Sequence, residues 1–265
     1  METAPSVRAW SPEVTGVAEV LHAHFPNHAY PSHTHDTWTV LLVDSGTVLY
    51  ELGRNEHATR RRSVTLLPPH VPHDGRGATP DGFRKRVVYL EEQTLDVGRV
   101  GRAVDQPVCV DRELLREVQL LHEALRHPGD ELEAAGCLAL VVELLGRHLG
   151  GDESPAVPLA DTALAARLRE LLDAHVVSGI TLADAAGVLD AHPAALVRAF
   201  RRELGISPHR YLTGRRIDSA RRLLLAGQAP ADVAAEVGFH DQSHLTRHFK
   251  RVLGVTPGAF SRASA

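Results

Sequence analysis

The sequence predicts an α+β protein of two domains, a β-rich N-terminal domain followed by an all-α C-terminal domain. Short apolar runs separated by turn residues make up the first part of the chain, and one helical sequence pattern occurs twice near the C-terminus. Between them, residues 151–160 read GDESPAVPLA, a mixture of Gly, Pro, Ser and acidic residues typical of a linker. The predicted domains are therefore 1–150 and 161–265, joined by the linker 151–160.

The first domain is predicted to be a β-sandwich or small barrel. Its strand candidates are WTVLLV (38–43), TVLYEL (47–52), SVTLL (63–67) and FRKRVVYL (83–90). Asp44-Ser45-Gly46 predicts a turn that pairs the first two runs as a hairpin. Helical periodicity is scarce there, and short strands between turn signals favour a sandwich or barrel.

Residues 111–149 predict a helical hairpin. Asp111 is a plausible N-cap, HPG at 127–129 ends the first helix, and a second apolar helix begins at Glu131. The apolar face of the hairpin either packs on the first domain or forms a dimer seam. A seam would expose part of five leucines, namely Leu114, Leu121, Leu125, Leu140 and Leu144.

An internal repeat defines the second domain. LVRAFRRELGISP (196–208) and LTRHFKRVLGVTP (245–257) share seven residues at an offset of 49. Each copy follows a small alanine and a turn, and places Leu and Phe at i, i+4 on one helix face. This pattern predicts two helix-turn-helix units. Ser207-Pro208 opens a helix that joins them and ends at Gly227, so two reading helices could enter successive major grooves.

Charge and composition restrict the classes of protein to which this chain can belong. Residues 1–160 carry 15 basic and 23 acidic side chains, and the rest carries 14 and 10, so the C-terminal part is basic and suits a polyanion. No apolar run is long enough to span a membrane, and the N-terminus lacks the apolar core of a secretory signal. Two cysteines, Cys109 and Cys137, make a disulfide framework unexpected, and we expect a cytoplasmic protein with no membrane partner.

Residues 163–262, and especially IDSARRLLLAGQAPADVAAEVGFHDQSHLTRHFKRVLGVTPGAF (217–260), resemble the DNA-binding domain of AraC/XylS-type transcriptional regulators. The resemblance implies a sequence-specific regulator, more often an activator, with double-stranded DNA as its partner. We also expect a homodimer and contact with RNA polymerase.

The resemblance assigns the DNA-binding residues by position. Base-facing residues are Ala194, Val197 and Arg198 in the first unit and Gln242, Ser243, Thr246 and Arg247 in the second. Arg can bond guanine and Gln can bond adenine, whereas Ala and Val offer only apolar contacts, so the first unit is the poorer reader. The residues expected at phosphate or solvent are Arg201, Arg202, Lys250 and Arg251. Four histidines, His192, His240, His244 and His248, are expected near the surface in the same role.

The segments FPNHAYPSHTHDTWTVLLVDSG and SVTLLPPHVPHDG resemble the cupin-type sensor domain that often precedes this DNA-binding domain. On a strand, His33 and His35 share one face, and the cupin pattern adds His73. Three imidazoles could bind a divalent metal such as zinc or iron, or line an effector pocket together with Trp38 and Tyr30. The glutamate expected after the second histidine is replaced by Thr39 or Val40, which leaves an oxygenase site unsupported.

These observations predict a regulator, not an enzyme, that responds to a small molecule or a metal in its first domain. One alternative is a cupin-type metal-dependent enzyme with an accessory DNA-binding domain, and the missing glutamate argues against it. Another alternative is an architectural DNA binder, which would not discriminate among DNA sequences.

Overall fold

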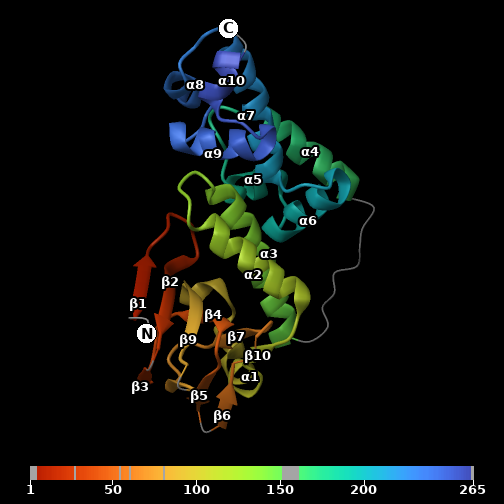
Figure 1. Cartoon of the computed structure of the whole chain (residues 1–265). Coiled ribbons are helices and arrows are strands. Elements are labelled where there is room, and N and C mark those ends of the chain that lie inside the picture. The colour runs from red at the N-terminus through yellow and green to blue at the C-terminus, as the bar shows by residue number, and fades with distance from the viewer. Residues whose placement is uncertain are drawn as a thin grey trace. The chain divides into compact units, whose positions relative to one another are not determined.

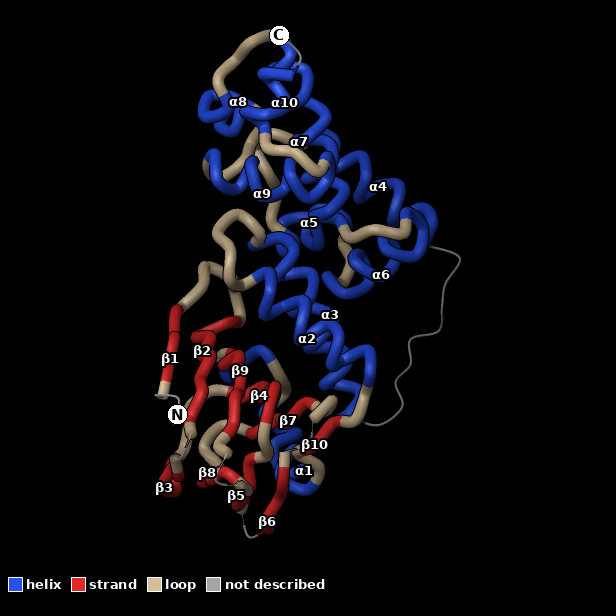
Figure 2. Tube along the Cα trace, in the orientation of Figure 1, coloured by secondary structure: helices blue, strands red, loops and turns tan. Residues whose placement is uncertain are grey.

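The computed structural model describes residues 5–26, 28–53, 55–59, 61–79, 81–150 and 161–263. The chain divides into two compact units, Met1–His122 with Leu140–Pro155 and Glu123–Ala139 with Ala156–Ala265. The first unit holds two β-sheets and the second is helical, which confirms the α+β prediction (Figures 1 and 2). The predicted linker, 151–160, lies outside the described residues. The domain boundaries 1–150 and 161–265 stay a prediction.

The first unit is built on two antiparallel sheets, with strand orders β1-β2-β9-β4-β7-β10 and β3-β8-β5-β6. The strands are β1 (Ser6–Trp10), β2 (Val17–Phe25), β3 (Ala29–His33), β4 (Trp38–Ser45), β5 (Val48–Leu52), β6 (Asn55–Ala58), β7 (Val64–Leu67), β8 (His73–Gly77), β9 (Phe83–Leu90) and β10 (Val108–Cys109). Each of the four strand candidates from the sequence is a strand, because their β-branched and aromatic residues suit a buried sheet.

The predicted pairing of 38–43 with 47–52 as a hairpin is wrong. β4 pairs with β7 and β9, whereas β5 pairs with β6 and β8 in the other sheet. The turn itself is present: Gly46 has φ +76°, and a side chain there would collide with the backbone of Gly82. This tight, left-handed corner carries the chain from one sheet to the other, so the two strands lie in facing sheets.

The helical hairpin is confirmed as α2 (Arg112–Ala124) and α3 (Glu131–Gly150). The Asp111 carboxylate accepts hydrogen bonds from the backbone N–H groups of Glu113 and Leu114, which confirms the N-cap. Two 3-10 turns, η1 (Glu92–Thr94) and η2 (Val97–Arg99), and helix α1 (Val100–Asp105) precede the hairpin.

The leucines assigned to a dimer seam do not form an exposed surface. Leu114, Leu121, Leu125, Leu140 and Leu144 are each at most 6% exposed in the single chain. The helical spacing of these leucines correctly predicted an apolar face. Because that face is buried within the single chain, these leucines are not available to pair with a second copy.

The second unit contains the two predicted helix pairs. Its helices are α4 (Asp161–Ala174), α5 (Leu182–Leu189), α6 (Pro193–Leu204), α7 (Pro208–Leu225), α8 (Pro230–Glu236), α9 (Gln242–Leu253) and α10 (Pro257–Ala263). α5 with α6 and α8 with α9 are the repeated units, and α7 joins them, with Ser207 as its N-cap. The paired anchors Leu196, Phe200, Leu245 and Phe249 are fully buried, which confirms the role that the i, i+4 spacing predicted.

Candidate nucleic-acid interface and ligand cavity

Helix α9 presents the polar residues that the sequence places at DNA. The Asp241 carboxylate caps the helix by accepting a hydrogen bond from the His244 N–H at 2.6 Å. Gln242 and Ser243 in the first turn are exposed, and Thr246 is half-buried one turn later. Lys250 and Arg251 are exposed in the last turn. This helix can therefore offer an amide and a hydroxyl near its N-terminus and cations near its C-terminus.

Arg247 already has an acidic partner in the structure. Its Nη2 donates to Asp130 Oδ2 at 2.9 Å and lies 3.3 Å from His248 Nε2. Asp130 is only 10% exposed at its side chain, so the carboxylate is shielded from water. The guanidinium has five N–H donors, so this contact takes up part of its donor set and holds the side chain toward Asp130.

Helix α6 offers less to a nucleic acid. Ala194 and Val197, which the resemblance assigns to bases, are buried, and a side chain placed at Gly136 on α3 would contact Val197. Neither side chain is accessible to DNA in this arrangement. Arg198 and Arg201 are half-buried and Arg202 is exposed. The first helix pair thus presents basic groups rather than a base-reading surface.

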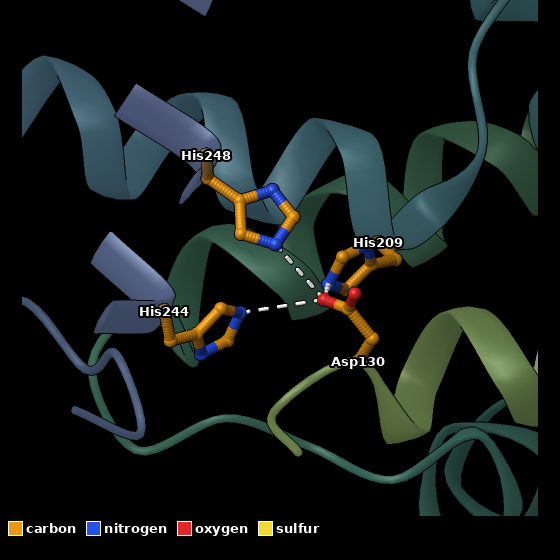
Figure 3. A group of neighbouring side chains, drawn as sticks. All are labelled: Asp130, His209, His244 and His248. Carbon is orange, nitrogen blue, oxygen red and sulfur yellow. Dashed lines mark hydrogen bonds and ion pairs between the residues drawn. The ribbon is translucent and has the colours of Figure 1, made fainter. Parts of the chain in front are cut away.

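Two of the four histidines expected at the surface are buried. His192 and His240 are exposed as predicted, but His244 and His248 are 2% and 5% exposed. They converge on Asp130 together with His209 of α7, as Figure 3 shows. His209 and Asp130 were missed by the sequence reasoning. The i, i+4 spacing of His244 and His248, each directly before an anchor residue, is the signal that pointed inward.

The electrostatics of this cluster follow from its burial. Burial lowers the pKa of His209 to about 3 and also lowers the pKa of His244. Burial alone would raise the pKa of Asp130, but the imidazoles of His244 and His248 outweigh it and hold this pKa well below its usual range. At neutral pH, His209 and His244 are therefore neutral and Asp130 is ionised.

A cavity of about 100 Å³ lies between the two sheets of the first unit. Both sheets contribute to its wall, which includes the three histidines predicted from the sequence. The lining residues are Leu21, Tyr30, His33, His35, Thr39, Leu41, Val48, Tyr50, Leu67, His73, Asp74, Gly75, Lys85, Val87 and Tyr89. The ring centroids of His33 and His73 are 4.7 Å apart, and those of His33 and His35 are 4.9 Å apart. The structure therefore brings His33, His35 and His73 together.

Burial controls the charge of the cavity wall. It lowers the pKa of His35 to about 4 and lowers that of His73. It also lowers the pKa of Lys85 to about 8, and the Lys85 ammonium lies 4.1 Å from the centroid of the Tyr30 ring. At neutral pH, His35 and His73 are therefore neutral and Lys85 is mostly protonated.

Trp38 does not line this cavity, which corrects its assignment to the effector pocket. Side chains alternate along a strand, and Thr39 and Leu41 of β4 are the ones that face the cavity. Trp38 points to the opposite side of the sheet, where it is fully buried and donates to the Glu92 carbonyl at 3.1 Å. Tyr30, by contrast, is part of the wall.

The stability of the first unit should fall as the pH is lowered from 7 to 4. Because the folded-state pKa values of His35 and His73 lie below the ordinary 6.5, protons bind the unfolded chain more tightly below that pH. Calorimetry of the metal-free chain should show the melting temperature falling through this window, and His35→Asn should flatten the dependence. An unchanged slope in His35→Asn would contradict the assignment.

Two family models match the chain side by side. The AraC-like ligand binding domain matches residues 15–142, and a helix-turn-helix domain matches residues 182–263. The chain belongs to the AraC family of transcriptional regulators. The ligand-binding model covers the sheets, the cavity and most of the hairpin, and the helix-turn-helix model covers both repeated helix pairs.

Relatives of this AraC-family chain are named as regulators. It is 25% identical to the uncharacterized HTH-type transcriptional regulator YbfI of Bacillus subtilis, over 82% of this chain and 81% of the relative. It is also 25% identical to the transcriptional activator RhaS of Yersinia pestis, over 89% and 91%. Among solved structures, the C-terminal domain of AraT from Geobacillus stearothermophilus is 32% identical, covers 38% of this chain and 84% of its own, and has a TM-score of 0.36.

The AraC-family assignment makes the protein a transcriptional regulator that binds DNA and carries a ligand-binding N-terminal domain. Its relatives are regulators rather than enzymes, which answers the enzyme alternative. Within the part of the chain that the structure describes, no helix combines the length and apolarity needed to cross a membrane.

Proposed function

We propose that this AraC-family regulator is an activator whose affinity for its operator changes when a small polar molecule binds in the cavity of the first unit. The observation that carries the proposal is the convergence of His33, His35, His73 and Lys85 on one cavity. A few polar groups in a mostly apolar cavity are the usual means of orienting a small ligand.

The wall chemistry favours a ligand with carboxylate or hydroxyl groups. Lys85 is mostly protonated at neutral pH, so it can pair with an anionic group. His33 Nδ1 donates to the Pro31 carbonyl at 2.7 Å and His73 Nδ1 donates to the Val71 carbonyl at 3.1 Å. These bonds fix the tautomers, because a carbonyl can only accept, and leave Nε2 of both rings as acceptors for ligand hydroxyl groups.

A divalent metal is the second candidate occupant, favoured by one observation. Ligand atoms of His33, His35 and His73 all lie within 4.8 Å of one another. Three imidazoles suit zinc or iron. The nearby Asp74 carboxylate already accepts a hydrogen bond from the Glu51 N–H at 2.6 Å, so any metal here would rest on the imidazoles.

Binding to DNA is assigned to the basic second unit. We infer that Gln242, Ser243, Thr246 and Arg247 read bases and that Lys250 and Arg251 contact phosphates. We also infer that the protein acts as a homodimer and contacts RNA polymerase, as an activator would. Since the hairpin leucines are buried, the dimer surface must be formed by other residues.

The experiment compares His33→Ala with His35→Ala as a double variant, the wild type, and the control His70→Ala, an exposed histidine outside the cavity. Operator binding by each full-length chain is titrated with small carboxylates and sugars, and separately with Zn²⁺. One ligand class should change wild-type and control affinity by about 5-fold or more. The double variant should not respond but should keep its unliganded affinity. An equal response in all three chains would refute the cavity as the sensor.

A further inference from the structure

The second unit contains a buried group of four potential metal ligands that is separate from the cavity histidines. Asp130 Oδ1 lies 2.9 Å from His248 Nε2, 3.3 Å from His244 Nε2 and 3.4 Å from His209 Nε2. The four ligand atoms all lie within 4.8 Å of one another (Figure 3). Ligands at about 2.0–2.1 Å from a tetrahedral metal are separated from each other by roughly 3.3 Å. The three oxygen-to-nitrogen distances therefore match the edges of such a tetrahedron.

One donor of this group is poorly satisfied in the structure. The buried Nε2 of His244 lies 3.3 Å from Asp130 Oδ1 but does not form a well-directed hydrogen bond there, although its side chain is only 2% exposed. A poorly satisfied buried polar atom is costly, and a bound cation would satisfy it. Hydrogen bonds alone do not account for this group. Three imidazole nitrogens cannot all form well-directed hydrogen bonds with the same carboxylate oxygen.

The backbone around Asp130 is shaped to bring the carboxylate to the histidines. Gly129 has φ +93°, and a side chain at this position would collide with the His244 ring. Glycine is thus required both for the left-handed turn and for the close approach. The adjacent His127 carbonyl accepts a hydrogen bond from the Asp130 N–H at 3.3 Å, which holds the turn closed.

Groups behind the four ligands would support a bound cation. Glu133 Oε2 lies 3.8 Å from His209 Nδ1 and accepts a hydrogen bond from Ser207 Oγ at 2.6 Å. Arg247 donates to the second oxygen of Asp130, Oδ2, at 2.9 Å. A carboxylate behind a ligating histidine and a donor on a ligating carboxylate are the usual outer contacts of a metal site.

We propose that Asp130, His209, His244 and His248 form a binding site for a divalent transition-metal ion of the zinc type. Three imidazoles and one carboxylate suit zinc and similar ions, whereas calcium and magnesium require mainly oxygen ligands. All four side chains are at most 10% exposed, so the site offers no open position to a substrate. Its role is structural: the ion joins the turn before α3 to α7 and α9.

Loading the site has a defined consequence at the start of α9. His244 Nδ1 accepts a hydrogen bond from the His240 N–H at 3.2 Å, so the free imidazole carries its proton on Nε2. A metal bond at Nε2 displaces that proton and leaves Nδ1 protonated, and the contact with the His240 N–H is then lost. We expect backbone resonances of 240–244 to shift on loading, beside the exposed Gln242 and Ser243.

The test uses full-length chains that already carry His33→Ala and His35→Ala, so that His73 is the one histidine left of the three-histidine group in the cavity. Co²⁺ is added as a spectroscopic probe and Zn²⁺ affinity is measured by competition with a chelator. We expect one ion per chain, the intense visible absorption of tetrahedral Co²⁺, and a raised melting temperature. Loss of a ligand in Asp130→Asn or His209→Gln should weaken binding at least about 100-fold, and Glu133→Gln about 10- to 100-fold.

The matched control is His240→Ala, which removes an exposed imidazole near the site without removing a ligand. It should retain the stoichiometry and the Co²⁺ spectrum. The proposal is overturned if the parent chain shows no tetrahedral Co²⁺ spectrum, whatever the fold of the other variants. It is also overturned if Glu133→Gln and His209→Gln bind Zn²⁺ as tightly as the control. Failure of this site leaves the proposed sensing cavity untouched, because every chain in this test lacks His33 and His35 and so does not probe that cavity.

Discussion

Replacing Phe249 with alanine is expected to destabilise the second unit by about 3–5 kcal/mol, the cost of removing a buried aromatic ring and leaving a cavity. Phe249 is fully buried in a core formed with Ile217, Phe239 and Leu245. Its ring also makes an edge contact with Phe260 at a centroid distance of 5.4 Å. The loss removes a large part of a typical domain's stability, so α9 and specific DNA binding should be lost together.

The measurement is calorimetry of the full-length chain, in which the two units are allowed separate transitions. The transition of the second unit should fall by roughly 12 °C or more, since about 1 kcal/mol corresponds to about 4–8 °C in a domain of this size. Val252→Ala, on the same helix but 56% exposed, is the control and should change little. A Phe249→Ala loss below about 1 kcal/mol would mean that the repeated anchors do not hold the helix pairs.

The second large effect concerns Arg247. Arg247→Ala is expected to cost about 1–3 kcal/mol of operator binding, roughly 5- to 150-fold, and to relax specificity at one base pair. We expect the lower half of this range. In the free protein Arg247 is bound to the shielded Asp130, so a base competes with that carboxylate for the guanidinium and the net contribution of the arginine is reduced.

The operator is located first by footprinting the DNA upstream of the protein's own gene, and affinities are then measured on the operator and on random DNA. Lys250→Ala is the matched control, because Lys250 is an exposed cation one helical turn further along α9. It should weaken both DNAs equally and reduce the salt dependence by about one unit. Equal losses on both DNAs for Arg247→Ala would assign Arg247 to the phosphate backbone instead. Sequence discrimination by the wild type also separates a regulator from an architectural binder.

The position of Asp130 suggests how Arg247 could be regulated. It precedes α3, a helix that continues into the residues of the first unit, and its carboxylate holds both Arg247 and the buried histidines. Any change that withdraws Asp130 from α9 would release the Arg247 guanidinium, which we propose reads a base. A ligand can use this device only to the extent that its affinity differs between the two states.

The sequence by itself determined the two domain classes, the helical hairpin and the repeated helix pairs. These features depend on local patterns: Leu196 with Phe200 and Leu245 with Phe249 mark an inward face, and Ser207 and Asp241 provide caps. The meeting of His33, His35 and His73 was also predicted, from the i, i+2 spacing of the first two and from a motif for the third, although β3 ends at His33 and His35 lies in the loop that follows.

Only the tertiary structure decided which strands pair and which distant residues pack against each helix. β4 and β5 follow one another in the chain, but the corner at Gly46 places them in different sheets. His244 and His248 alternate with polar residues on a helix that looks solvent-facing, yet Asp130 covers them from 118 residues away in the case of His248. Periodicity reports which face of an element is apolar. It does not report which distant polar group meets the other face, because that depends on how separate elements pack.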